Sequence, residues 1–166
     1  MLAYLGLGSN EGDSLAALRA AARALGRRGV KVLVASSVWE TAPQGEVLDQ
    51  ADFLNACLRV EASLGSEELL DVCKVVERDG GRAPGAQKHG PRPIDVDVLL
   101  VDGVEHRSER MVLPHPEIPT RRFVLEPLLE LDPALRLPDG TALAPMLDAV
   151  RDQRVTRLEP LLSRSD

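Results

Sequence analysis

The feature that most limits the fold of this sequence is the alternating segment Phe53–Glu61. All of its even positions are apolar, whereas its odd positions carry an aromatic ring, an amide, a thiol and two charged groups. A period of two is typical of a β-strand that buries one face, so we expect the even positions to face the core. By the same parity, Phe53 and Asn55 share the opposite face. There they either form a wall for a flat, hydrogen-bonding ligand or are covered by a neighbouring loop.

Extended and helical patterns alternate along the rest of the chain. Further strands are expected at 2–7, 30–38 and 94–101, and helices at 15–28, 66–78, 121–131 and from about 143. Asp13 and Ser66 are expected to cap the first two helices, and Gly6, Gly8 and Gly12 to mark a sharp turn after the first strand. Loops are expected at 41–46 and 79–93, a hairpin at 102–103, and a Pro-rich stretch at 113–119.

The composition predicts a single domain, 1–166, with residues 151–166 as a C-terminal tail. Apolar residues make up 44% of the chain and charged residues 28%, which permits a packed core without disulfides. Cys57 and Cys73 lack metal-ligand spacing and are expected to be buried thiols in a reducing compartment. With no basic leader in residues 1–10 and no apolar run long enough to span a bilayer, we expect a cytoplasmic protein without a membrane partner.

The charge distribution favours a small anionic ligand. A formal net charge of −6 argues against nucleic acid as a partner, because nucleic-acid-binding proteins usually present a basic face to the phosphates. Residues 78–92 nevertheless carry a local charge of +3. A positive pocket in an acidic protein suggests a small polyanion as the substrate. We expect the protein to be a monomer or a weak homodimer.

Asp95 and Asp97 are candidate metal ligands. Two residues apart on a strand, their carboxylates project from one face, while Val96 and Val98 pack on the other. Two such carboxylates can share a pair of Mg²⁺ ions that keep positions open for phosphate oxygens. Taken alone, the pattern favours a solvated acidic edge strand over a metal site.

Basic residues surround this acidic pair in the sequence. Arg92 precedes it, and His115, Arg121 and Arg122 follow it. Arginine suits phosphate oxygens, and cations at the start of a helix oppose the helix dipole, which favours an anion near Arg121 and Arg122. The alternatives are a core histidine in a Pro-rich corner and a solvent-exposed helix start.

Five ordered segments resemble the 6-hydroxymethyl-7,8-dihydropterin pyrophosphokinase family. They are Gly6-Leu-Gly-Ser-Asn10, Ser36-Ser-Val-Trp-Glu-Thr-Ala-Pro43, Gln50-Ala-Asp-Phe-Leu-Asn55, Gly90-Pro-Arg-Pro-Ile-Asp-Val-Asp97, and Leu113-Pro-His-Pro with Arg121-Arg-Phe123. Their combination is far more specific than any one of them. The resemblance implies an α+β, ferredoxin-like two-layer sandwich with a mainly antiparallel sheet. It also implies Mg²⁺, ATP as co-substrate, and transfer of diphosphate to the pterin's hydroxymethyl oxygen with release of AMP, in folate biosynthesis.

The resemblance assigns roles to individual positions. Asp95 and Asp97 would hold two Mg²⁺ ions that bridge the triphosphate, and Arg82 and Arg92 would join them in catalysis. The ATP-binding residues would be Glu77, Arg82, Arg92, Val98, His115 and Arg121. The pterin would stack between Phe53 and Phe123. Asn55 and the backbone around Thr41, Ala42 and Pro43 would read its hydrogen-bonding edge.

Three positions depart from the family's usual pattern, namely Pro84, His89 and Pro116. The family often has arginine, tryptophan and an aromatic residue there, so these changes bear on lid closure and on the grip on ATP. Two other functions use the same residues. One is a Mg²⁺-dependent nucleotidyl transferase or cyclase, which would release pyrophosphate, and the other is a non-catalytic module that binds a nucleotide or pterin.

Overall fold

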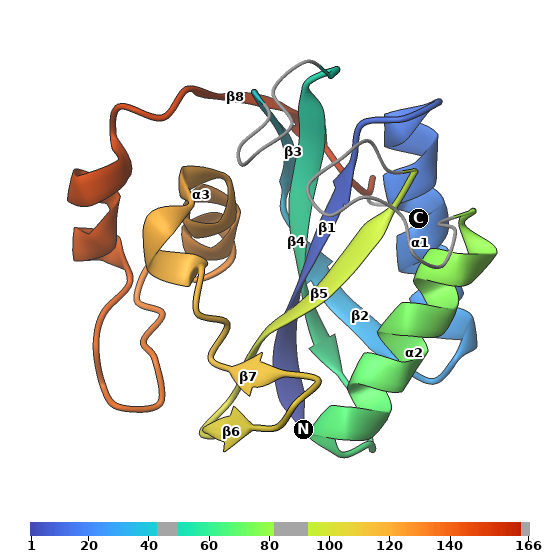
Figure 1. Cartoon of the computed structure of the whole chain (residues 1–166), viewed down its shortest axis with the longest axis horizontal. Helices are drawn as coiled ribbons and strands as arrows, with labels where there is room; N and C mark the ends of the chain where they lie inside the picture. Colours follow the sequence, from blue (N-terminus) through green and yellow to red (C-terminus); the bar gives the residue numbers. More distant parts are fainter. Residues whose placement is uncertain (43–49, 82–92, 164–166) are drawn as a thin grey trace.

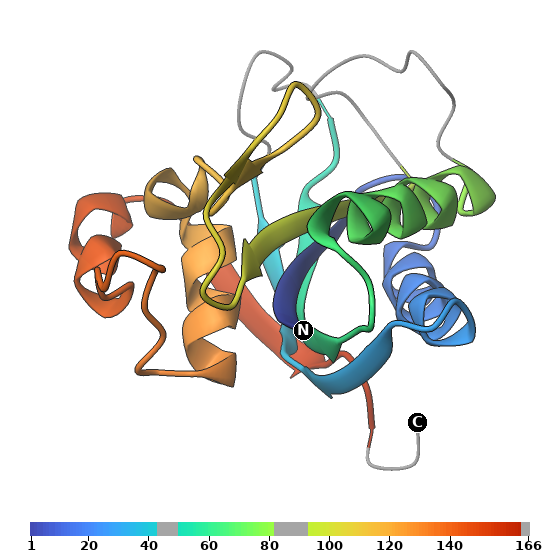
Figure 2. The same cartoon turned by 90° about the horizontal axis from the view of Figure 1, so that it is seen from below.

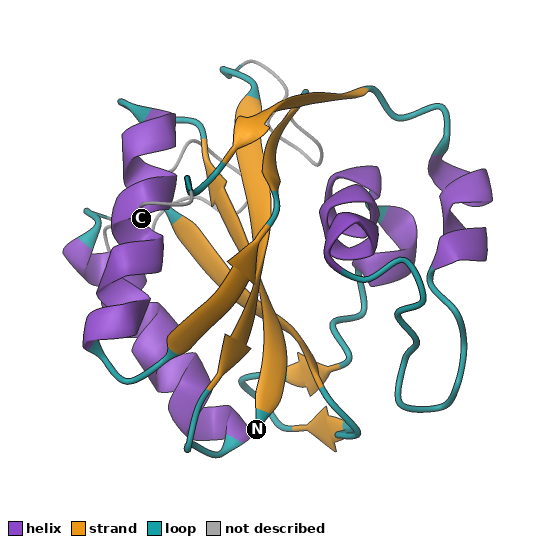
Figure 3. Cartoon of the chain, turned by 180° about the vertical axis from the view of Figure 1, so that it is seen from behind, coloured by secondary structure: helices purple, strands orange, loops and turns teal. Residues whose placement is uncertain are grey.

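An antiparallel sheet forms the centre of the structure, a computed structural model that describes residues 1–42, 50–81 and 93–163. Its strands are β1 (Leu2–Ser9), β2 (Lys31–Ala35), β3 (Ser37–Thr41), β4 (Phe53–Glu61), β5 (Asp95–Val101) and β8 (Val155–Pro160). They lie in the order β5-β1-β4-β3-β8, and β2 also pairs with β4 (Figures 1 and 3). The expected α+β, ferredoxin-like sandwich with a mainly antiparallel sheet is confirmed.

Helices lie on both faces of this sheet. Figure 2 shows α1 (Ser14–Arg27) and α2 (Ser66–Asp79) on one side and α3 (Arg122–Leu131) on the other. Two short 3₁₀ helices, η1 (Ile118–Thr120) and η2 (Ala144–Val150), accompany α3. The hairpin β6 (His106–Arg107) and β7 (Val112–Leu113) forms a separate small sheet. Among the described residues, no helix is long and apolar enough to cross a membrane.

Strand β4 separates two hydrophobic cores. Its even residues Ala56, Leu58 and Val60 pack in the core beneath α1 and α2, as the alternation predicts. On the odd face, Cys57 belongs to a second core, which includes Leu125 and Leu128 of α3. Helix α3 therefore covers part of the odd face of β4. Parity alone does not indicate which helix covers it.

The single strand expected at 30–38 is two strands that meet at Ser36. The Ser36 N–H donates to the Cys57 carbonyl, and the Cys57 N–H donates to Ser36 Oγ, both at 2.9 Å. This side-chain bond replaces a ladder bond at the junction, where β2 pairs with residues 58–61 of β4 and β3 pairs with residues 53–55. An apolar pattern cannot show such a break, because Ser36 and Ser37 are both buried.

Three further sequence expectations need correction. Gly6 and Gly8 lie within β1 rather than in a turn. Gly65, not Ser66, is the N-cap of α2, and its N–H donates to Glu68 Oε1 at 3.4 Å. The paired strands after the turn at 102–103 are β6 and β7, which follow that turn instead of flanking it.

The segment expected as a tail contains β8, which pairs with β3 at the edge of the main sheet. Its sequence is mostly polar and exposed, so no apolar alternation marks it as a strand. By contrast, the N-terminal end of α1 is confirmed, since the Asp13 side chain accepts a hydrogen bond from the Ala16 N–H at 3.1 Å.

Gly80 provides a test of the packing between α2 and β5. A Cβ at this C-cap position would lie 2.5 Å from Ile94 Cγ2, so Gly80→Ala should lower the free energy of unfolding by about 1–3 kcal/mol. Gly26→Ala is the matched control, because nothing lies within 4 Å of its Cβ position in α1. That change should stabilise the protein by up to about 1 kcal/mol through helix propensity. Urea unfolding measures both, and equal effects would contradict the close contact.

Candidate functional site

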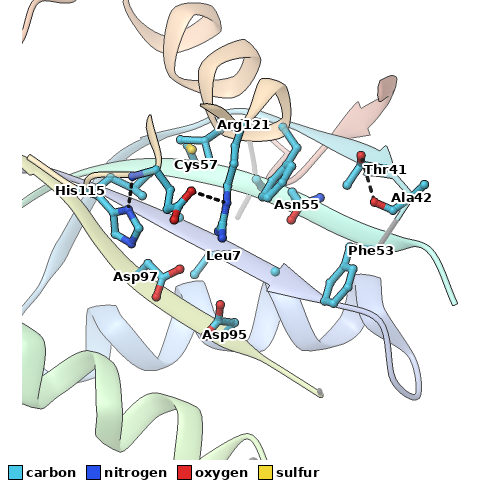
Figure 4. A pocket seen from close by; sticks show the side chains of 17 residues that line it. Leu7, Thr41, Ala42, Phe53, Asn55, Cys57, Asp95, Asp97, His115 and Arg121 are labelled. Carbon is cyan, nitrogen blue, oxygen red and sulfur yellow. Dashed lines mark hydrogen bonds and ion pairs between the residues drawn. The ribbon is translucent and has the colours of Figure 1, made fainter. Parts of the chain in front are cut away.

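A pocket opens on the face of the sheet that α3 covers (Figure 4). Its floor comes from alternate residues of three neighbouring strands, namely Gly6 and Gly8 of β1, Asn55 and Cys57 of β4, and Asp95 and Asp97 of β5. Its remaining walls include Thr41, Ala42 and Phe53 on one side and His115, Glu117, Arg121, Phe123 and Val124 on the other.

The two glycines of β1 keep this floor open. A Cβ at Gly8 would lie 3.2 Å from Asn55 Oδ1, and one at Gly6 would lie 3.2 Å from Leu99 Cδ1. Side chains at these positions would press on Asn55 and Leu99 and fill the space above the strand. Gly6 and Gly8 therefore allow the side chains of neighbouring strands to lie close to the backbone of β1.

Three carboxylates cluster at the acidic side of the pocket, two of them in its wall and one behind the strand. Glu77 of α2 joins Asp95 and Asp97, and one oxygen from each lies within 4.8 Å of the other two. Glu77 is 4% exposed, and its Oε1 accepts the Val96 N–H at 2.9 Å. Lys74 Nζ lies 3.5 Å from Glu77 Oε2. β5 is an edge strand, and the hydrogen bond from its Val96 N–H, between the two aspartates, to Glu77 holds that edge against α2.

The pKa of Asp97 reflects this crowding. Burial first, and then the charges of Asp95 and Glu77, raise this pKa to about 8, while Lys74 acts in the opposite direction. A carboxyl group in this position retains a proton until a cation replaces it. An all-oxygen cluster of this kind is the donor set that Mg²⁺ prefers.

His115 and Arg121 lie across the pocket from the acidic residues (Figure 4). His115 Nδ1 accepts the Glu117 N–H at 3.1 Å. Burial, and then the charge of Arg121, lower the pKa of His115, so the ring is neutral at pH 7. With Nδ1 used as an acceptor, the proton of the neutral ring belongs on Nε2. The ring can therefore donate one hydrogen bond to a ligand.

Arg121 lies between Glu117 and Phe123. Its Nε is 3.6 Å from Glu117 Oε2, and its guanidinium lies 5.6 Å from the centre of the Phe123 ring. Arg122, which was expected to face the same anion, turns away and donates to the carbonyls of Arg151 and Gln153 at 3.1 and 2.9 Å. The dipole argument from the sequence therefore applies to Arg121 alone.

Asn55 supplies an unsatisfied donor to the opposite end of the pocket. The residue is 6% exposed, and its Nδ2 is buried and has no hydrogen-bond partner among the residues that the structure describes. Buried polar atoms nearly always have partners, so an orphaned amide in a pocket wall indicates a ligand that accepts its hydrogen bond. Phe53, on the odd face of β4, and Phe123, near the start of α3, line the same pocket.

Nine of the residues expected from the sequence line this one pocket: Thr41, Ala42, Phe53, Asn55, Asp95, Asp97, His115, Arg121 and Phe123. Two others lie elsewhere. Glu77 joins the carboxylates from behind the strand, and Val98 is 3% exposed in the core beneath α2. The expected positions Pro43, Arg82 and Arg92 lie outside the described residues, as do Pro84 and His89. Pro116 is exposed beside His115.

Sequence reasoning missed Cys57, Leu99, Glu117 and Val124 as lining residues, and Glu77 as a member of the acidic cluster. Glu77 leaves a signal in the sequence, because it continues the buried stripe of Leu70 and Cys73 at helical spacing. A carboxylate on the inward face of a helix needs a partner. The burial of the Cys57 thiol raises its pKa, so this floor residue stays protonated.

Comparison with known proteins identifies the family. The model of 7,8-dihydro-6-hydroxymethylpterin-pyrophosphokinase (HPPK) matches residues 4–133. The 2-amino-4-hydroxy-6-hydroxymethyldihydropteridine pyrophosphokinase of Methylorubrum extorquens is 43% identical over 134 residues, which are 80% of this chain and 84% of that protein. The enzyme of the same name from Bacillus subtilis is 40% identical over 131 residues, or 78% of this chain and 77% of that protein.

Larger relatives contain a similar region. The chain is 42% identical over 127 residues to the mitochondrial folate synthesis bifunctional protein of Arabidopsis thaliana, which is 76% of this chain but only 23% of that protein. Among solved structures, Plasmodium falciparum HPPK-DHPS with pteroate gives a TM-score of 0.69 at 13% identity, covering 90% of this chain and 44% of that one. This last likeness concerns the fold. On the family match and the bacterial relatives together, the chain belongs to the 7,8-dihydro-6-hydroxymethylpterin-pyrophosphokinase family.

Proposed function

We propose that this chain transfers diphosphate from ATP to the hydroxymethyl group of 6-hydroxymethyl-7,8-dihydropterin, releasing AMP, as a step of folate biosynthesis. The bacterial relatives that it nearly spans carry the name of this activity. The single observation that supports the proposal best is that one pocket combines an acidic cluster with an orphaned amide between two phenylalanines.

The acidic end would receive the triphosphate of ATP with Mg²⁺. Asp95 and Asp97 would hold two ions, and Glu77 would fix the strand that carries them, since its Oε1 is already used by the Val96 N–H. Bound Mg²⁺ would neutralise the phosphate charge and stabilise the departing AMP. Opposite, His115 would donate from Nε2, and Arg121 would add a fixed positive charge beside the phosphates. Arg82 and Arg92 belong to the proposal through family resemblance alone.

The other end would receive the pterin. A planar ring with amide-like edges would stack between Phe53 and Phe123, which both line the pocket, and would accept a hydrogen bond from Asn55 Nδ2. The backbone of Thr41, Ala42 and Pro43 would contact the remaining edge. Binding both substrates in one pocket would bring the hydroxymethyl oxygen of the pterin next to the β-phosphorus of ATP. Catalysis would then rest on positioning and charge neutralisation without a covalent protein intermediate.

An assay of products tests the donor, the acceptor and the reaction together. With Mg²⁺, ATP and the reduced pterin alcohol, the chain should release AMP and the pterin diphosphate in equal amounts. Release of pyrophosphate instead would favour a nucleotidyl transferase or cyclase. Tight binding of both ligands without AMP release over hours would favour a non-catalytic module.

Asp97→Asn should abolish turnover while leaving the fold intact. The substitution removes a carboxylate that the metal needs, so AMP release should fall by about 10³-fold or more. At pH 7 the amide replaces a carboxyl group that is already largely protonated, so the metal-free variant should be at least as stable as the wild type. Near-normal AMP release at saturating Mg²⁺ would contradict the metal role. Asp152→Asn, an exposed carboxylate far along the chain, is the control.

The stability of the metal-free protein should depend on pH in a defined direction. The folded pKa of Asp97, about 8, exceeds its ordinary value of about 4, so between these values the folded state binds more protons. Stability should therefore fall as pH rises from about 4 to 8, by about 1–3 kcal/mol. Thermal unfolding across this range measures the slope. Saturating Mg²⁺ or Asp97→Asn should flatten it, and an unchanged slope in the variant would assign the effect to other groups.

Phe123→Ala should weaken pterin binding by about 1–3 kcal/mol through lost burial and stacking. Phe123→Leu keeps an apolar side chain without the aromatic face, so it should recover only part of the affinity. Titration calorimetry with the pterin alcohol gives both dissociation constants. If Phe123→Ala binds the pterin as tightly as the wild type, the ring does not contact it.

A further inference from the structure

Helix α3 begins at the pocket but has no cap of its own. Arg121 occupies the N-cap position, and no side chain at that position bonds the first turn. The first turn also contains no acidic residue. Helices usually begin with Ser, Thr, Asp or Asn, whose side chains satisfy the free N–H groups, and positive charge there opposes the dipole. The N-cap position of α3, where a side chain normally stabilises the helix start, is therefore occupied by a residue that lines the pocket.

Gln153 supplies the missing cap from a distant part of the chain. Its Oε1 accepts the Arg122 N–H at 2.9 Å, and its Nε2 donates to the Thr120 carbonyl at 2.8 Å. The two bonds span Arg121 on both sides. Arg122 Nη1 returns a bond to the Gln153 carbonyl at 2.9 Å, so the segment and the helix start hold one another.

The segment that carries Gln153 is itself anchored. It continues into β8, which pairs with β3 and crosses beside α3 (Figure 1). Arg157 Nη2 lies 3.0 Å from Glu130 Oε2 near the last turn of α3. Glu130 also accepts bonds from the Ser37 N–H at 3.0 Å and from Trp39 Nε1 at 3.1 Å. One short stretch of chain therefore holds both ends of α3 against the sheet.

We infer that Gln153 is a positioning residue for the pocket: by capping α3 from outside, it sets the placement of Arg121 and Phe123. This inference rests on the proposed function for the identity of the substrates. It concerns a part of the chain beyond residues 4–133, the range that the family model matches. Gln153 itself does not line the pocket, so its effect passes through the helix start.

Two substitutions at Gln153 test its hydrogen bonds separately from the space that its side chain fills. Gln153→Met has a similar length but makes neither bond. Gln153→Glu keeps an acceptor for the Arg122 N–H and places negative charge at a helix N-terminus, where it is favourable. Asp152→Asn is the matched control, since Asp152 is the exposed neighbour in the same turn. All three are measured well below their unfolding temperatures.

Gln153→Met should raise KM for the pterin alcohol about 5- to 10-fold, corresponding to the loss of two neutral hydrogen bonds, with a smaller change in kcat. Amide hydrogen exchange at Arg122 to Leu125 should accelerate more than in the core strands. Gln153→Glu keeps the bond from the Arg122 N–H but cannot donate to the Thr120 carbonyl, so its KM should lie between those of Gln153→Met and the wild type. Asp152→Asn should change neither KM nor exchange.

The two proposals fail in different ways. If the wild type releases no AMP, the proposed function fails, while hydrogen exchange and pterin titration still test the cap. If the wild type is active and Gln153→Met leaves KM and exchange at the start of α3 unchanged, the inference is wrong. If Gln153→Met does not fold, the comparison of Gln153→Glu with Asp152→Asn decides. A KM for the pterin alcohol equal to that of Asp152→Asn, or a Gln153→Glu variant that does not fold, would then mean that the residue serves the fold alone.

Discussion

Two carboxylates on one face of an edge strand repel each other, and the candidate site depends on holding them together. An edge strand lacks a neighbour on one side, so its backbone could shift to relieve that repulsion. Glu77 prevents this by accepting the Val96 N–H between the two aspartates, and Lys74 offsets part of its charge. The result is a cluster of oxygen ligands suited to a cation at this edge of the sheet.

The pocket above these carboxylates exists because the sheet is covered unequally. On one face α1 and α2 pack closely on large apolar side chains. On the other face Gly6 and Gly8 leave the strands bare, and α3 covers only part of them. The start of α3 then borders the cavity, which brings Arg121 and Phe123 opposite the strands. The layer that completes the second core thus also forms one wall of the pocket.

Much of this arrangement follows from local patterns in the sequence. The alternation of Phe53–Glu61 predicts β4 and puts Phe53 and Asn55 on one face, and the spacing of Asp95 and Asp97 does the same for β5. Other features have no local signal. The bend at Ser36 depends on Cys57, and β8 is polar and becomes a strand only because β3 offers it backbone partners.

The sequence by itself determined which side chains share a face, because the period of a strand or helix is a property of the local backbone. It also determined the family and the residue types available for phosphate, metal and ring binding. Only the tertiary structure decided that Glu77 completes the acidic cluster, that Arg121 faces the pocket while Arg122 does not, and that Gln153 caps α3. The hydrogen bonds of Glu77 and Gln153 join residues 19, 31 and 33 positions apart, so they follow from how whole elements pack rather than from any local pattern.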